Sequence, residues 1–328
     1  MYVEMVKQFS GNKKKQWKDL LESTGLTPQE EVIDTVLLWD DEKLAGAGSR
    51  DGNLLKYIAV APEYQGEDLT SVILSHLRKE AFSQGVNHLF LYTKPQNEKM
   101  FQALFFYTVA KTKDVLLMEN RKDGILEFLN GLDPQNVSGK VGAIVMNANP
   151  FTLGHRYLIE TASKECDYLY VFVVSEDKSK FSAKDRMEMV KLGTADLENV
   201  KVLPTGAYLV SSATFPTYFL KEREKATSVQ CSLDVEIFKN YFAPKFMIGY
   251  RFVGTEPLSL MTNQYNQALK KGFCDSGIEV VEIERLSVNG VPVSASRVRD
   301  LIKNKQTQEI RQMVPATTYE YLKNIGII

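Results

Sequence analysis

A polar turn in the middle of the chain combines residue types that suit phosphate chemistry. It reads NANPFTLGHR from 147 to 156 and follows a continuous apolar run at residues 140–146. Pro150 fixes the backbone of the turn, and Gly154 allows the backbone to approach a ligand closely at the start of an expected helix. A helix N-terminus presents unpaired N–H groups and the positive end of the helix dipole. The sequence therefore predicts an anion site that suits a polyphosphate.

Two side chains, Thr152 and His155, lie within one helical turn of this predicted anion site. A lone histidine is more often a cap or a core residue, but its place after a strand, a proline and a threonine favours a functional role. The spacing resembles the T/H-x-G-H signature of the nucleotidyltransferase superfamily, in which a substrate attacks the α-phosphate of ATP and pyrophosphate leaves. The resemblance implies that His155 and Thr152 are catalytic and stabilise charge on that phosphate. The other residues expected to bind ATP here are Asn147, Asn149, Pro150, Phe151 and Gly154.

A second phosphate motif is expected near the C-terminus, in the segment VSASRVRD at 293–300. Serines at a helix start, followed by an arginine one turn later, form a cradle for phosphate oxygens. The segment resembles the ISSTxxR motif of the same superfamily, although Ala295 replaces the second serine and Ser296 the threonine. The resemblance implies a catalytic Arg299 and ATP contacts from Ser294 and Ser296. An ordinary capped helix is the alternative for this segment taken alone.

Three further residues are candidate ATP contacts because each follows an expected strand. Lys178 and Lys180 come after the second strand of the second half and are long enough to reach the β- and γ-phosphates, although surface lysines are usually only solvated. Gly254 follows a later strand and would border the nucleotide. The sequence contains no acidic metal cage, so we expect no protein-held metal and a Mg²⁺ ion bound mainly through ATP.

The elements around these motifs alternate between strand and helix. Strands are expected at 140–146, 168–174, 200–203, 246–253 and 278–284, and helices at 154–164, 183–196, 215–242 and 258–270. This alternation predicts a doubly wound, Rossmann-like parallel sheet in an α/β fold. Such sheets bind ligands at the carboxyl ends of their strands, where the strand order reverses.

The first half of the chain has a more mixed, α+β pattern. A hairpin at 35–48 precedes strands at 54–60 and 88–92, with helices at 69–82 and 97–106. The turn-rich stretch 131–139 predicts a linker between domains at 1–135 and 136–328. Residues 57–66 resemble the GNAT acetyltransferase fold, but Asp68 and Thr70 replace glycines of its pyrophosphate loop. The resemblance implies a degenerate domain that does not bind acetyl-CoA in the usual way.

Bulk composition sets limits on the class of protein. The net charge is −1, with 44% apolar and 25% charged residues among 328, so neither a nucleic-acid nor a membrane partner is expected. The three cysteines do not form a disulfide framework or a zinc motif. The first residues lack a secretory signal pattern. A cytoplasmic location is the simplest expectation.

Several ordered segments narrow the resemblance to one family. The runs VGAIVMNANPFTLGHRYLIETAS, FSAKDRMEMVKLG, ATFPTYFLK, SLDVEIF, RFVGTEP, TNQYN and VSASRVRDLI span most of residues 140–303. Together they resemble the citrate (pro-3S)-lyase ligase family. The resemblance implies that acetate attacks ATP to form acetyl-AMP. The acetyl group then passes to the thiol of a phosphoribosyl-dephospho-CoA group on the acyl carrier subunit of citrate lyase. Residues 211–220 are a candidate wall of the acyl pocket.

Two other functions remain open at this stage. The chain could be an adenylyltransferase acting on pantetheine phosphate or nicotinamide mononucleotide, with an accessory domain attached. It could also be a GNAT acetyltransferase or an acyl-CoA sensor with a nucleotide-binding appendage. The departures at Asp68 and Thr70 argue against the last reading.

Overall fold

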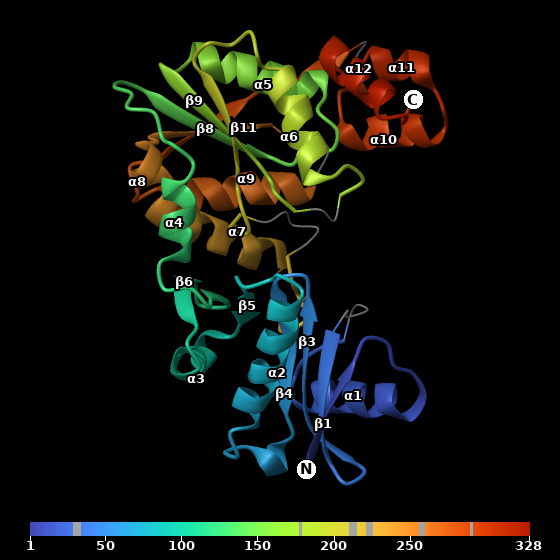
Figure 1. Ribbon diagram of the computed structural model, residues 1–328. Coiled ribbons are helices and arrows are strands. Elements are labelled where there is room, and N and C mark those ends of the chain that lie inside the picture. The colour runs from blue at the N-terminus through green and yellow to red at the C-terminus, as the bar shows by residue number, and fades with distance from the viewer. Residues whose placement is uncertain (29–33, 177–178, 210–214, 221–225, 256–259, 289–290) are drawn as a thin grey trace. The chain divides into compact units, whose positions relative to one another are not determined.

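The computed structural model (Figure 1) describes residues 1–28, 34–176, 179–209, 215–220, 226–255, 260–288 and 291–328. The chain divides into two compact units. The first comprises Met1–Gly124 together with Pro216–Val229, and the second comprises Ile125–Phe215 together with Gln230–Ile328. The first unit is therefore built from two separate stretches of chain.

A seven-stranded sheet forms the centre of the first unit, in the order β1-β2-β3-β4-β5-β7-β6. Its strands are β1 (Tyr2–Val6), β2 (Asp34–Asp40), β3 (Lys43–Asp51), β4 (Leu54–Val60), β5 (Phe90–Thr93), β6 (Tyr107–Lys111) and β7 (Leu116–Glu119). The helices of this unit are α1 (Gly11–Ser23), α2 (Leu69–Ser83) and α3 (Glu98–Ala103). The predicted hairpin is confirmed, because β2 and β3 pair antiparallel with Asp40 opposite Lys43.

Strands β4 and β5 are the one parallel pair described in this sheet, and their pairing is short. Their ladder contains only Leu54 opposite Phe90 and Leu55 opposite Leu91. A pocket of about 680 Å³ lies beyond that point, lined by both strands, the start of α2 and the returning residues Tyr218 and Phe219. The first unit thus contains a large pocket where two parallel strands separate.

The second unit contains a five-stranded sheet in the order β10-β9-β8-β11-β12, and every ladder in it is parallel. The strands are β8 (Val141–Met146), β9 (Tyr168–Val173), β10 (Val200–Pro204), β11 (Tyr250–Gly254) and β12 (Glu279–Ile283). The chain runs outward from β8 through β9 to β10, and then continues on the other side through β11 to β12. The strand order therefore reverses between β8 and β11, as expected of a doubly wound sheet.

Both faces of this sheet are covered, because successive side chains of a strand point to opposite faces. Leu169, Val171 and Val173 of β9 pack in a core with α5 (Leu153–Lys164) and α6 (Ala183–Leu192). Tyr170 and Phe172 of the same strand meet aromatic rings from residues 238–246 instead. Figure 1 shows α5 and α6 on one side of the strands and α7 (Ala226–Ile237) with α9 (Leu260–Phe273) on the other. This arrangement explains the continuous apolar runs in the sequence.

The C-terminal part adds a small hairpin and three helices. The hairpin consists of β13 (Ser287–Val288) and β14 (Val291–Pro292), and the helices are α10 (Ala295–Lys303), α11 (Thr307–Arg311) and α12 (Ala316–Asn324). Apolar residues from these helices, including Val298, Ile310 and Leu322, join the core that contains α5 and α6. The second phosphate motif is thereby attached to the same core as the first.

The strand predicted at residues 246–253 is too long at its start. Phe246 ends the short helix α8 (Ala243–Phe246), Met247 adopts a left-handed φ of 54°, and Ile248 N donates to Ala243 O at 2.9 Å. These features form a helix cap, and β11 begins only at Tyr250. The sequence did not reveal the boundary because a buried helix end and a buried strand are both apolar.

The helices described here include none with the length and apolar character needed to cross a lipid bilayer.

The polar turn at residues 147–156, which is expected to bind phosphates, is called the phosphate turn below. Gly193 supports it by leaving room for Phe151. A Cβ atom added at Gly193 would lie 2.4 Å from Phe151 Cε1 and 3.0 Å from Met189 O, whereas one added at Gly249 would meet nothing within 4 Å. We predict that Gly193→Ala destabilises the chain by about 1–3 kcal/mol in urea denaturation, because the core is overpacked. Gly249→Ala is the matched control and should change the stability by less than about 0.5 kcal/mol. Equal stability of the two variants would contradict this packing role.

Candidate active site

The polar turn joins the carboxyl end of β8 to the N-terminus of α5. Thr152 is the N-cap residue of α5, with extended backbone angles and a side chain that accepts from His155 N at 3.4 Å. His155 returns the interaction, because its Nδ1 accepts from Thr152 N at 3.1 Å. This reciprocal cap satisfies two backbone donors and fixes the imidazole at the helix start.

The cap also determines which nitrogen of His155 carries the proton. Since Thr152 N–H donates to Nδ1, a neutral ring must be protonated at Nε2. Burial, with a contribution from the positive charge of Arg285, lowers the pKa of His155 to about 4. The neutral ring is therefore the form present near pH 7, and its Nε2–H is the donor left for a ligand. Phe151 lies parallel to the ring, with centroids 5.9 Å apart.

A pocket of about 210 Å³ opens beside this histidine. Its lining comes from the ends of β8, β11 and β12, the first turns of α5, part of α9, and the segment around the start of α10. The lining residues used below are Thr152, Gly154, His155, Gly254, Asn266 and Arg285. The pocket thus lies at the carboxyl edge of the sheet, where the strand order reverses. This is the position at which doubly wound sheets bind nucleotides.

Arg299 brings the second motif to the first. Its Nη1 donates to Asn149 O at 2.6 Å, and its Nη2 donates to Ser296 Oγ at 3.0 Å. Ser294 caps α10 by accepting from Arg297 N at 3.2 Å. Although about 150 residues separate the two motifs in the sequence, a single guanidinium bridges them.

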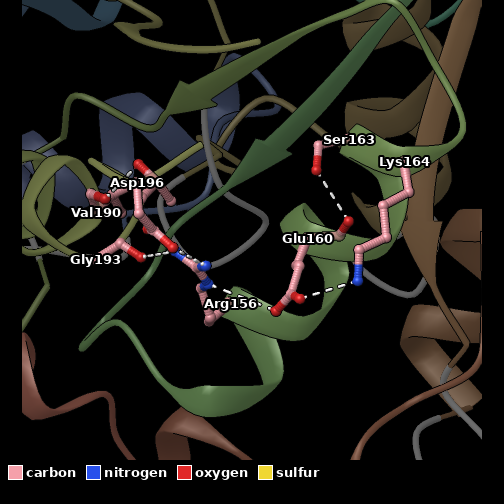
Figure 2. A network of polar contacts seen from close by, with 8 residues as sticks. Arg156, Glu160, Ser163, Lys164, Val190, Gly193 and Asp196 are labelled. Atoms are coloured by element: carbon pink, nitrogen blue, oxygen red, sulfur yellow. Dashed lines mark hydrogen bonds and ion pairs between the residues drawn. The ribbon is translucent and has the colours of Figure 1, made fainter. Parts of the chain in front are cut away.

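A surface network holds the first turn of α5 against the end of α6 (Figure 2). Arg156 Nη1 donates to Gly193 O at 2.6 Å, and both Nη atoms contact the carboxylate of Asp196, at 2.6 and 2.7 Å. Along the same helix, Lys164 pairs with Glu160 at 3.0 Å. The bidentate arginine fixes the orientation of the helix that carries His155.

The remaining predicted residues differ in how they relate to the pocket. Gly154 and Gly254 line it, and Gly154 is also tight against the protein itself, since an added Cβ would lie 3.2 Å from Val293 O. Phe151 is fully buried in the core, and Pro150 is buried and follows a cis peptide bond. Lys180 is exposed and does not line the pocket, while Lys178 lies outside the described residues.

Sequence reasoning missed several polar residues of this pocket, among them Arg285 and Asn266. Arg285 follows the end of β12, and its side chain reaches Val293 O at 3.3 Å. Asn266 is buried in α9, and its amide donates to Gly254 O at 3.0 Å. The only available signal for Arg285 was its position just after an apolar strand, at the carboxyl edge of a parallel sheet.

Within the described ranges, no group of three or more His, Cys, Asp or Glu side chains is arranged to hold a metal ion. The side chains around the phosphate turn are instead amides, hydroxyls and guanidinium groups. Their N–H and O–H donors can bind anionic oxygens.

The larger pocket of the first unit is chemically different. Asp68 and Thr70, the two departures from the GNAT loop, both line it, as do Tyr218 and Phe219. Tyr218 is buried, and its hydroxyl donates to Tyr92 O at 3.0 Å. From the segment expected to wall an acyl pocket, Tyr218 and Phe219 therefore line the pocket of the first unit, and no described residue of 215–220 lines the pocket beside His155.

Comparison with known proteins gives two family matches. The profile described as "Citrate lyase ligase C-terminal domain" matches residues 141–322. The profile described as "Acetyltransferase (GNAT) family" matches residues 3–106. The two matches agree with the GNAT-like α+β fold of the first unit and the doubly wound fold of the second.

Individual relatives cover nearly the whole chain. The citrate (pro-3S)-lyase ligase of Klebsiella pneumoniae is 43% identical over 291 residues, which are 87% of this chain and 85% of that protein. The ligase of the same name from Escherichia coli (strain K12) is 38% identical over 98% of this chain and 93% of its own length. Phosphopantetheine adenylyltransferase of Clostridium botulinum (strain 657 / Type Ba4) is 24% identical over 51% of this chain and 90% of that protein.

The protonation of His155 is a measurable consequence of the capped geometry. We predict that its imidazole titrates with a midpoint near 4 in an NMR titration of the ligand-free protein, rather than near 6.5. Between these two values the unfolded chain binds a proton that the folded chain does not. The free energy of unfolding therefore falls as the pH drops from about 6.5 towards 4. Added ATP should raise the midpoint, because its negative charge favours the protonated ring. A midpoint near 6.5 without ATP would contradict the buried, neutral assignment.

Proposed function

The chain belongs to the citrate lyase ligase family, and from this premise we propose that it is an ATP-dependent ligase that activates acetate. In the first step a carboxylate oxygen of acetate attacks the α-phosphorus of ATP. The bond from that phosphorus to the bridging oxygen breaks, and pyrophosphate leaves. In the second step a thiol sulfur attacks the acetyl carbonyl carbon, AMP leaves, and the thiol proton passes to solvent. The thiol is that of the phosphoribosyl-dephospho-CoA group on the acyl carrier subunit of citrate lyase, which becomes active when acetylated.

The observation that carries this proposal is the oriented Nε2–H of His155. A donor held at a helix N-terminus is already positioned for the charge that develops on the α-phosphate, so it needs no reorganisation during the reaction. Thr152 orients the ring through Nδ1, and the neutral state keeps the proton on Nε2 near pH 7. These contacts support a role in stabilising charge, while the attacking group is a substrate carboxylate.

The attack brings two negatively charged substrates together, and cations at the site reduce their repulsion. Arg285 lines the pocket beside His155, and Arg299 supports the turn from the other motif. A Mg²⁺ ion, bound mainly through ATP oxygens, would neutralise charge on the leaving pyrophosphate. The proposed ATP contacts are those of the two motifs, together with Gly254 and the exposed Lys180.

A second candidate function is transfer of the adenylyl group to a phosphorylated acceptor. The 24% match to a phosphopantetheine adenylyltransferase favours it, because that match covers 90% of the relative's length. The first step of the ligase and the adenylyl transfer both attack the α-phosphate and differ in the attacking group, and only the ligase has a second step. The acceptor that the reaction requires therefore distinguishes the two functions.

Exchange of labelled pyrophosphate into ATP tests the proposal directly. We predict exchange that requires acetate, and His155→Ala should slow it by about a hundredfold to a thousandfold through loss of one transition-state donor. Exchange that ignores acetate and requires phosphopantetheine would replace the ligase with the adenylyltransferase. Thermal unfolding would verify that the variant keeps its fold.

His76→Ala is the matched control for this experiment. His76 lies in α2 of the first unit, where its Nδ1 contacts Val72 O at 2.9 Å. The control should exchange pyrophosphate at the wild-type rate. An equal loss in both histidine variants would contradict the specific role of His155.

Arg299→Ala tests the bridge between the two motifs. Loss of the charged contacts to Asn149 O and Ser296 Oγ should raise the Kd for ATP by about tenfold to a hundredfold in calorimetric titration. Arg297→Ala, on the exposed side of the same helix, is the control and should bind ATP as the wild type does. Unchanged affinity in the Arg299 variant would remove this residue from the site.

A further inference from the structure

A large charged side chain near the proposed active site, that of Arg186 in α6, is completely buried, with 0% of its surface exposed. Its guanidinium donates to oxygens in three places: Asn147 O at 3.0 Å and Oδ1 at 2.7 Å, Val174 O at 2.6 Å with Glu176 O, and Phe181 O at 3.2 Å. These acceptors follow β8, follow β9 and precede α6, respectively. All three donor nitrogens of the fork are therefore used at the carboxyl edge of the sheet.

Burying a guanidinium is costly unless its donors are paired, so packing alone does not account for this residue. An apolar side chain of similar volume would fill the same space without that cost. The bonds are directed at the loops that follow two neighbouring parallel strands. The backbone groups of these loops have no partners in the strand ladders. Arg186 therefore joins those loops to α6.

Asn147 is the residue of the phosphate turn that Arg186 contacts. Arg186 Nη1 donates to Asn147 Oδ1, which leaves the Nδ2 group facing Ser179 Oγ, 3.2 Å away. The next asparagine is held from the same region, since Asn149 Oδ1 accepts from Phe181 N at 3.2 Å. Arg299 holds the same turn at Asn149 O. Two arginines from different helices therefore bond to the turn, and one of them, Arg186, is fully buried.

We propose that Arg186 is a positioning residue that holds the turn from Asn147 to Pro150, and the Asn147 amide, in the form that binds the phosphates of ATP. It acts through the turn and does not touch ATP, because its side chain is fully buried. The inference rests on the proposed function of this turn as the ATP site. It identifies a buried residue, outside the two sequence motifs, that determines the affinity for ATP.

The test is Arg186→Lys, studied in the full-length chain. Lysine keeps the charge but offers one nitrogen in place of a planar fork, so most of the directed bonds are lost. The Kd for ATP should rise by about tenfold in calorimetric titration, as expected when a buried charged hydrogen bond is lost from a binding loop. The measurement is made below the unfolding temperature of the variant, so that only folded protein is compared.

Arg50→Lys is the matched control for burial. Arg50 lies in β3 of the first unit, is 2% exposed, and donates to Gly52 O at 2.6 Å as well as to Asp34 and Gln84. This substitution should lower the unfolding temperature while the Kd for ATP stays at the wild-type value. If Arg186 has only a structural role, Arg186→Lys should also lower the unfolding temperature without changing the Kd for ATP. If it is a positioning residue, the Kd for ATP should rise in Arg186→Lys and not in Arg50→Lys.

Asn147→Ala provides a second measurement that leaves the buried fork in place. Arg186 keeps its bonds to Asn147 O and Val174 O in this variant, so the fold should persist while the Kd for ATP rises by a similar factor. Wild-type affinity in folded Arg186→Lys or in Asn147→Ala would overturn the inference and leave the proposed function standing. Failure of the wild-type chain to bind ATP at all would overturn the proposed function and this inference with it.

Discussion

The hydrogen bond from Thr152 N–H to Nδ1 of His155 is the contact on which the proposed chemistry depends. It closes the first turn of α5, fixes the ring orientation and leaves the imidazole proton on Nε2, the nitrogen that the cap does not use. One backbone donor therefore gives the helix start both stability and a directed side-chain donor. The rest of the second unit holds this pair at the carboxyl edge of the sheet.

Two of the arginines near this edge join it to other segments of the second unit. Arg299 comes from a helix near the C-terminus and contacts the phosphate turn at a backbone carbonyl. Arg156 fixes α5 at the surface by contacting the end of α6. Because these contacts join segments far apart in the sequence, the geometry of the site depends on the folded core of the second unit as well as on its motifs.

The motifs and the alternation of elements were sufficient to predict the fold class, and the family resemblance is confirmed by the matches over most of the chain. The positions of His155 and Arg299 at one edge of a parallel sheet followed from the same reasoning. Arg186 and Arg285 were not predicted. A buried arginine has no local signature, since arginines are mostly exposed, and its role here comes from partners up to 39 residues away. Likewise, the start of β11 depends on a helix cap that apolar periodicity does not reveal.

The first unit cannot be defined by one continuous stretch, because it includes Pro216–Val229 as well as Met1–Gly124. Tyr218, from the later stretch, packs with its ring 4.7 Å from that of Tyr57 and bonds to the backbone of β5. During synthesis on the ribosome, this unit lacks part of its interior until about a hundred further residues have been translated. The first unit is therefore completed only after the first stretch of the second unit has been translated, and a protein shortened after Gly124 would expose the surface that Tyr218 covers.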